Sequence, residues 1–249
     1  MSENIKNFRS PDYLMVVPDV NSLNRAAVNE ITVAAEAAIA EHGRFTISLS
    51  GGNTPRGIYS LLAEKGDTFP WPKTFFFFGD ERSVPPDHPD SNYRMAKEAL
   101  FSKAPVPEHN VFRVPAELGA EKAADKYQAT LREFFKAQSG QWPRFDLILL
   151  GIGDEGHTAS LFPDSAALAE TSRLVAPNWI EKLKTNRITF TFPLINSAAE
   201  TMFLVAGPGK AEIVKSVFLS EREIYPVQRV RPARGRLLWI VDQAAASLL

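Results

Sequence analysis

Short apolar runs along the chain alternate with longer stretches in which apolar residues recur every three or four positions. This alternation is typical of strand–helix–strand units on a mostly parallel sheet. Several runs are apolar throughout, as expected for strands that helices cover on both faces. The expected strands are Tyr13–Val17, Phe45–Leu49, Phe75–Phe78, Leu147–Leu150, Met202–Val205 and Leu237–Val241.

The stretches between these runs have helical periodicity, most clearly at Ala123, Tyr127 and Leu131. Arg187–Phe192 instead alternates polar and apolar residues, which predicts a half-exposed strand at an antiparallel edge. Together these elements predict one α/β domain over residues 1–249, with a mostly parallel sheet flanked by helices. The expected helices are Ser22–Glu41, Pro55–Glu64, Asn92–Ser102, Ala120–Ala137 and Lys210–Phe218.

The composition excludes several classes of protein. Hydrophobic residues make up 45% of the chain and charged residues 23%, which are values of a folded globular protein. The net charge of -1 gives no general attraction to nucleic acid or to an acidic membrane, so any anion must be bound locally. The absence of cysteine excludes disulfides, thiolate–metal sites and thiol nucleophiles.

The sequence carries no sign of export or membrane insertion. No apolar run approaches the roughly 18 residues that a membrane helix needs. The first residues, MSENIKNFRSPDY, lack the apolar core of a leader peptide. We therefore expect a cytoplasmic protein that has neither a membrane nor a nucleic acid as a partner.

The segment SGGNTPRG, which follows the second strand, predicts an anion site. Gly51, Gly52 and Asn53 would place unpaired N–H groups at the positive end of a helix, which suits a phosphate or a carboxylate. Thr54 is a good cap for that helix, and Arg56 lies one turn inside it, where it can add positive charge. A plain tight turn explains the glycine pair equally well.

Three charged residues, Asp80, Glu81 and Arg82, follow the third strand. Ligands of open α/β sheets bind at the carboxyl ends of strands, where a carboxylate can accept hydrogen bonds from sugar hydroxyls and a guanidinium can bind phosphate. A surface ion pair is the alternative interpretation. His88 is close in sequence, but its proline-rich loop has no known metal-ligand spacing, so we expect no metal site.

The segment FDLILLGIGDEGHTASLFP gives the most specific signal. A buried strand ends there in a glycine-rich turn that brings Asp154, Glu155 and His157 to the same crevice. Imidazole titrates near neutrality, so His157 can take a proton from water during attack on a carbonyl, and a nearby carboxylate can orient its ring. The glycines also match the dinucleotide motif G-x-G-x-x-G. That motif usually lies in the first strand–helix unit, and two carboxylates would here meet the pyrophosphate, so we expect no nucleotide cofactor.

Taken in order, SGGNTPRG, GDERSVPPDHPDSN and GIGDEGHTASLFP resemble the motifs of the 6-phosphogluconolactonase family. RITFTFPLIN, FLVAGPGKAEIV and RPARGRLLWIVD resemble the carboxyl-terminal half of that family, so the resemblance runs from about Tyr13 to Asp242. It implies a Rossmann-like fold of the sugar-phosphate isomerase/deaminase type. It also implies hydrolysis of 6-phospho-D-glucono-1,5-lactone to 6-phosphogluconate in the oxidative pentose phosphate pathway.

By this resemblance His157 is the general base, and Arg82 and Lys210 bind the phosphate end of the substrate. Family members commonly carry Asp where this chain has Glu155, so the catalytic carboxylate keeps its charge on a longer arm. We expect no cofactor, a phosphorylated sugar lactone as the small-molecule partner, and a monomer, although the sequence does not exclude an oligomer. The expected substrate-binding residues are Gly51, Gly52, Asn53, Thr54, Arg56, Asp80, Arg82, Arg187 and Lys210.

Two alternatives stay open. Glucosamine-6-phosphate deaminases share the fold and resemble this chain in their glycine-rich turns and Gly-His pair. Their sequence continues toward Phe-Asn-Glu-Pro, whereas Thr158–Pro163 of this chain lacks that carboxylate. The other alternative is a non-catalytic sugar-phosphate sensor, but such regulators carry a DNA-binding helical domain, and this chain has no basic amino-terminal extension for one.

Overall fold

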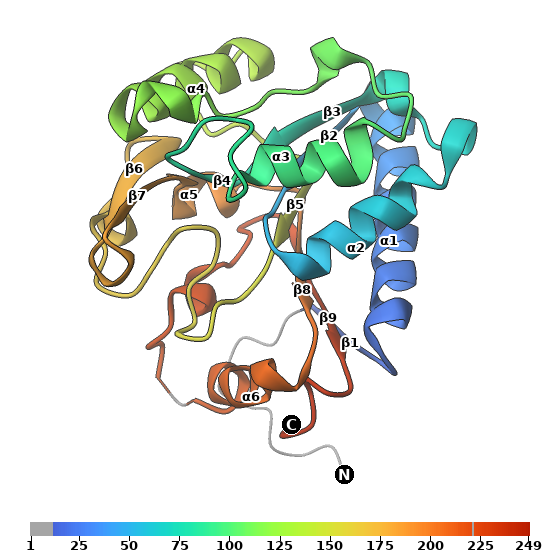
Figure 1. Cartoon of the computed structure of the whole chain (residues 1–249), viewed down its shortest axis with the longest axis vertical. Coiled ribbons are helices and arrows are strands. Elements are labelled where there is room, and N and C mark those ends of the chain that lie inside the picture. Colours follow the sequence, from blue (N-terminus) through green and yellow to red (C-terminus); the bar gives the residue numbers. More distant parts are fainter. Residues whose placement is uncertain (1–11, 221) are drawn as a thin grey trace.

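A sheet of six parallel strands, in the order β1-β9-β8-β5-β2-β3, runs through the centre of the structure (Figure 1). The structure is a computed structural model that describes residues 12–220 and 222–249. All six strands were predicted, with ends that differ from the prediction by at most two residues. They are β1 Tyr13–Val17, β2 Phe45–Leu49, β3 Thr74–Phe78, β5 Leu147–Leu150, β8 Glu200–Val205 and β9 Arg236–Asp242.

A second, smaller sheet has three antiparallel strands in the order β4-β7-β6. The alternating segment predicted at Arg187–Phe192 is indeed antiparallel, but it belongs to this separate sheet rather than to an edge of the large one. It ends earlier than predicted because α5, Phe192–Ile195, begins there, with a proline in its first turn. The strands are β4 Asp80–Arg82, β6 Val175–Ile180 and β7 Thr185–Phe190.

The five predicted helices are present, and their apolar faces cover the sheets. One of them differs from the prediction: the segment Asn92–Ser102 is α-helical only at its start and continues as a π-helical turn, Lys97–Phe101. Helices α1 and α2 pack against each other, and α4 packs on β6 and β7 (Figure 1). The helices are α1 Val20–His42, α2 Asn53–Ala63, α3 Asn92–Ala96, α4 Ala120–Phe135 and α6 Ala211–Leu219.

The core explains why the central strands are apolar throughout. Every residue of β2 and β5 is buried, because helices or the small sheet cover both faces of these strands. Phe77 of β3 stacks on Phe112 at a ring distance of 4.7 Å and meets Phe145 edge-on at 5.2 Å. Each such buried side chain contributes about 1.5–3 kcal/mol to folding. The turns that follow these strands are therefore fixed to a rigid core.

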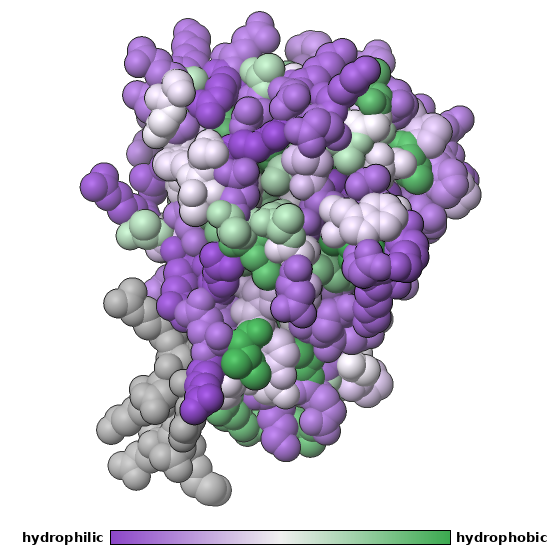
Figure 2. All heavy atoms as spheres, turned by 90° about the vertical axis from the view of Figure 1, so that its left-hand side faces the viewer, coloured by the Kyte–Doolittle hydropathy of each residue, from purple (hydrophilic) through white to green (hydrophobic). Residues whose placement is uncertain are grey.

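The surface on the side of β6, β7 and α4 is mostly polar, with apolar side chains in scattered groups (Figure 2). Within residues 12–220 and 222–249, no helix is both long and apolar enough to span a bilayer. Residues 1–11, in which we expected no leader peptide, lie outside the described residues. The single domain expected over residues 1–249 therefore stays a prediction for its first residues.

Candidate active site

A cavity of about 340 Å³ opens where the carboxyl ends of β2 and β5 meet β4 of the small sheet. Its walls come from the glycine turns after β2 and β5, and the side chains of Asp80, Arg82, His157 and Lys210 line it. Parallel strands bring their carboxyl ends to one edge of the sheet, so residues that are far apart in sequence converge there. The structure thus brings together most of the residues that the sequence analysis selected.

The turn after β2 has a different form from the one predicted. Gly52, not Thr54, is the cap of α2, and the helix begins at Asn53 with no side-chain cap. Gly52 has a φ of 107°, a conformation that favours glycine, so the chain enters the helix two residues earlier than a threonine cap requires. Gly51 lies so close to α3 that a Cβ there would come within 2.0 Å of Asn92 Oδ1.

His157 lies over the turn after β5. Its ring stacks on Phe162 with a centroid distance of 3.8 Å and an angle of 19°. Gly153 lies directly beneath the ring, because a Cβ at that position would stand 1.9 Å from His157 Cε1. Nδ1 of His157 lies 3.4 Å from Glu155 Oε2, within ion-pair distance. The ring is therefore held between an aromatic face, a glycine backbone and a carboxylate.

This environment keeps the imidazole neutral. Burial is the largest influence on His157 and lowers its pKa below the ordinary value of 6.5, although the negative charges of Glu155 and Asp80 oppose the shift. A neutral imidazole at neutral pH is the form that can accept a proton. For Glu155, burial favours the neutral acid, but the hydrogen bond from Lys182, its own backbone amide and the charge of His157 outweigh burial and lower the pKa.

Lys210 reaches the cavity from the turn before α6. Its Nζ lies 2.6 Å from Asp154 Oδ1, and this hydrogen bond is the main reason why the pKa of Asp154 is lowered. The side chain of Lys210 is 29% exposed, whereas that of Asp154 is 82% exposed. An incoming anion can therefore compete with Asp154 for the ammonium group.

Two of the three charged residues after β3, Asp80 and Glu81, have different roles. Asp80 lines the cavity and accepts a hydrogen bond from Ser160 Oγ at 2.7 Å. Glu81 points away and accepts from the backbone N–H of Asn92 at 2.8 Å and of Tyr93 at 2.9 Å, which caps α3. Burial raises the pKa of Glu81, and these hydrogen bonds oppose that shift.

Arg82 and Arg56 form a cationic rim, whereas Arg187, also predicted to bind substrate, is not among the residues that line the cavity. Arg82 and Arg187 lie directly opposite each other in the β4–β7 pair, where like charges repel. Burial lowers the pKa of Arg187, and the charge of Arg82 adds to that effect. A smaller neighbouring cavity of about 200 Å³ is lined by Asn53, Arg56 and Arg82, among others. This rim is suited to a doubly charged anion such as a phosphate.

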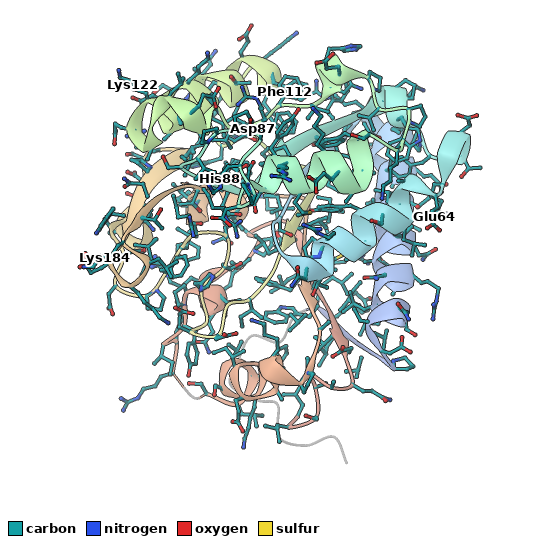
Figure 3. All side chains as sticks on the ribbon, in the orientation of Figure 1. Glu64, Asp87, His88, Phe112, Lys122 and Lys184 are labelled. Carbon is teal, nitrogen blue, oxygen red and sulfur yellow. The ribbon has the colours of Figure 1, made fainter. Side chains whose placement is uncertain are left out.

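His88 does not reach the cavity. It lies in the loop after β4, where its Nδ1 is 3.8 Å from Asp90 Oδ2 and accepts from the Asp90 N–H at 3.2 Å (Figure 3). Among residues 12–220 and 222–249, no group of three or more Asp, Glu or His side chains could hold a metal ion. Activity without a metal or another cofactor stays a prediction.

Comparison with known proteins places the chain in a family. The family described as glucosamine-6-phosphate isomerases/6-phosphogluconolactonase matches residues 18–239. The chain belongs to this family. The 6-phosphogluconolactonase of Synechocystis sp. is 45% identical over 222 residues, covering 88% of this chain and 90% of its own. That of Nostoc sp. is 40% identical over 237 residues, covering 94% and 97%.

Solved structures agree with the family assignment. The 6-phosphogluconolactonase from Trypanosoma cruzi superposes with a TM-score of 0.86 at 30% identity, covering 98% of each chain. A monomeric glucosamine-6-phosphate deaminase superposes with a TM-score of 0.78 at 20% identity, covering 95% of this chain and all of its own, and shows the shared fold alone. The predicted resemblance to the 6-phosphogluconolactonase side of the family is confirmed, and so is the fold class.

The sequence analysis did not select three residues that form hydrogen bonds with residues of the candidate site. Asn92 donates through Nδ2 to the carbonyl oxygen of Asp80 at 3.0 Å and packs on Gly51. Ser160 donates to the carboxylate of Asp80, and Lys182 donates to Glu155 at 2.9 Å. Asn92 and Ser160 lie inside the motifs GDERSVPPDHPDSN and GIGDEGHTASLFP, so their place in these motifs could have indicated them. No feature of the sequence pointed to Lys182.

Proposed function

We propose that this chain hydrolyses 6-phospho-D-glucono-1,5-lactone to 6-phosphogluconate in the oxidative pentose phosphate pathway, without a metal. Relatives that are 40% and 45% identical over most of the chain carry the name 6-phosphogluconolactonase. The structural observation that carries the proposal is the ring-stacked His157 with a carboxylate 3.4 Å from Nδ1 in a cavity also lined by Arg82 and Lys210.

The chemistry is a general-base hydrolysis of an ester. Nε2 of His157 takes a proton from a water molecule while the water oxygen attacks the lactone carbonyl carbon. The tetrahedral intermediate then expels the ring oxygen, which takes the proton from the imidazolium, so the base is restored. Glu155 holds the Nδ1–H side of the ring and stabilises its charged form. Backbone amides of the glycine turns are the expected donors to the oxyanion.

The phosphate end of the substrate is proposed to lie among the cationic side chains of the cavity. Arg82 and Lys210, both of which line the cavity, are the expected phosphate ligands, with Arg187 and Arg56 adding charge. The amides at the start of α2 complete this subsite, since a helix N-terminus attracts anions. The monomeric state and the cytoplasmic location stay predictions.

Replacing Arg82 with Ala is expected to raise KM for the phosphorylated lactone by about ten- to hundredfold, since a hydrogen bond to a charged group contributes about 1.5–3 kcal/mol. Steady-state kinetics with fresh substrate measures the change. Arg25, exposed on α1 and bonded only locally to Ser22, provides the control variant R25A with unchanged KM. A wild-type KM in R82A would mean that Arg82 is not a phosphate ligand.

A direct assay separates the lactonase from a deaminase. Purified protein should speed acid release from fresh 6-phosphogluconolactone above the spontaneous rate, and glucosamine 6-phosphate should yield no ammonia. The reason is that the segment after His157 lacks the carboxylate of the deaminases. Ammonia release at a comparable rate would reverse the assignment, and binding of both compounds without turnover would indicate a sensor.

A further inference from the structure

The turn between β6 and β7 contacts the loop after β5 that carries Glu155 and His157, which we call the histidine loop. Lys182, in the 3₁₀ turn Glu181–Leu183, places its Nζ 2.9 Å from Glu155 Oε1. The other oxygen of the same carboxylate, Oε2, lies 3.4 Å from His157 Nδ1. One carboxylate thus connects a lysine of the small sheet to the histidine of the large one.

Buried polar contacts fix this hairpin relative to the histidine loop. Asn178 of β6 is 1% exposed and donates through Nδ2 to the carbonyl oxygen of Ser160 at 2.8 Å. The N–H of Ser160 donates to Thr189 Oγ1 of β7 at 3.2 Å, and its Oγ donates to Asp80 at 2.7 Å. Because Ser160 lies three residues after His157, these hydrogen bonds connect the base of the hairpin to the histidine loop.

The charges around His157 come from several elements. Glu155 and Asp154 face it from its own loop, Asp80 from β4, and Lys210 from the turn before α6. Asp154 already has Lys210 as its partner at 2.6 Å. Lys182 is therefore the cation that pairs with Glu155, whose carboxylate lies next to His157 Nδ1.

The length of the Glu155 side chain explains how the contact with Lys182 can affect His157. A Glu side chain has one more rotatable bond than Asp, so its carboxylate loses more conformational freedom when it is fixed beside the ring. The hydrogen bond from Lys182 to Oε1 restricts that freedom and leaves Oε2 facing Nδ1 at 3.4 Å. The bond also favours the ionised acid, which in turn favours the tautomer with the proton on Nδ1 and a free lone pair on Nε2.

We propose that Lys182 is a positioning residue for lactone hydrolysis, which acts through Glu155 to orient the imidazole of His157 with Nε2 free to take a proton. This inference rests on the proposed function. Lys182 is not among the residues that line the cavity; its side chain is 72% exposed, and an exposed ion pair of this kind adds little to the stability of the fold. Its effect is expected in catalysis and not in unfolding.

The hairpin also supplies a matched control. Lys184 lies two residues after Lys182, is 71% exposed and pairs with Glu181, which is itself exposed (Figure 3). The variants K182M and K184M therefore remove the same charge from the same turn with the same gain in apolar surface. Only the first removes a contact to the histidine loop.

Kinetics of K182M, K184M and K182R as a function of pH test the proposal. In K182M we expect kcat to fall by about fivefold, KM and the melting temperature to stay unchanged, and the acid limb of the kcat profile to move to higher pH. The limb moves in that direction because Glu155, without its cation, favours the protonated imidazole more strongly. K182R should restore most of kcat, and K184M should match the wild type in every measurement.

The proposal is overturned if K182M has the kcat and pH profile of the wild type, or if K184M shows the same loss. These outcomes are distinct from failure of the proposed function. If the wild-type protein does not accelerate lactone hydrolysis, the proposed function itself is wrong. If the wild type is active and K182M has the same kcat and pH profile, only the role of Lys182 is rejected.

Discussion

Replacement of His157 with Ala is expected to lower kcat for lactone hydrolysis by about 10²–10⁴-fold, the usual contribution of a general base. Because the base acts in the transition state, kcat and kcat/KM should fall together while the affinity for 6-phosphogluconate stays the same. Steady-state kinetics and a product-binding titration measure both quantities. His109, exposed in a loop away from the cavity, provides the control variant H109A.

The wild-type pH profile gives an independent check. The pKa of His157 is lowered, so the protonated, inactive form appears only below the ordinary value of 6.5. The rate should therefore be constant near neutrality and fall as the pH drops through a midpoint below 6.5. An acid midpoint above that value would contradict the lowered pKa of His157, whereas an H157A variant with near wild-type rate would rule out His157 as the base and leave the phosphate subsite untouched.

Replacement of Gly153 with Ala is expected to lower kcat by about 10²-fold, since a displacement of about 1 Å of a catalytic group can have that effect. The added Cβ would stand 1.9 Å from Cε1 and 2.1 Å from Nδ1 of His157, so the ring must leave its place on Phe162. The φ of Gly153 is not in the left-handed region, so the backbone itself accepts alanine. The loss should therefore appear in kinetics and not in folding.

Gly151, in the same turn, offers the comparison. A Cβ there meets no atom within 4 Å and points into open space, so G151A should leave the imidazole in place. Because Gly151 lines the cavity, any effect of this variant should appear in KM and not in kcat. Equal losses of kcat in G151A and G153A would contradict the steric explanation for Gly153.

Hydrophobic pattern alone predicted the large sheet and failed for most of the small one. The central strands β2 and β5 are buried on both faces, and all six parallel strands leave a run of mostly apolar residues in the sequence, although β1 at the edge is partly exposed. Strand β4 consists of Asp80, Glu81 and Arg82, and β6 contains Pro177, which is unfavourable within a strand. Both strands depend on pairing with β7 rather than on local preference, and such long-range pairing leaves no signal in a short window.

The site was predictable where it follows buried strands. Gly51, Gly52 and His157 were selected because the strand before each turn could be recognised, and the structure places all three on the cavity. The cap at Thr54 was wrong because a threonine cap is a local preference, whereas Gly52 adopts a positive φ that lets α2 begin at Asn53. The contact of Lys182 depends on where the β6–β7 turn lies in space.

The edge position of β1 has a consequence for biosynthesis. Its neighbour in the sheet is β9, and Tyr13 lies opposite Leu238, so a strand made early pairs with one made more than 200 residues later. Until β9 emerges, the unpaired backbone groups of β1 and of β8 are open to other chains, and such contacts between distant segments form slowly. A nascent chain that stalls before Arg236 therefore exposes two strand edges at once, so the synthesis of β9 is the step that covers both edges and limits aggregation.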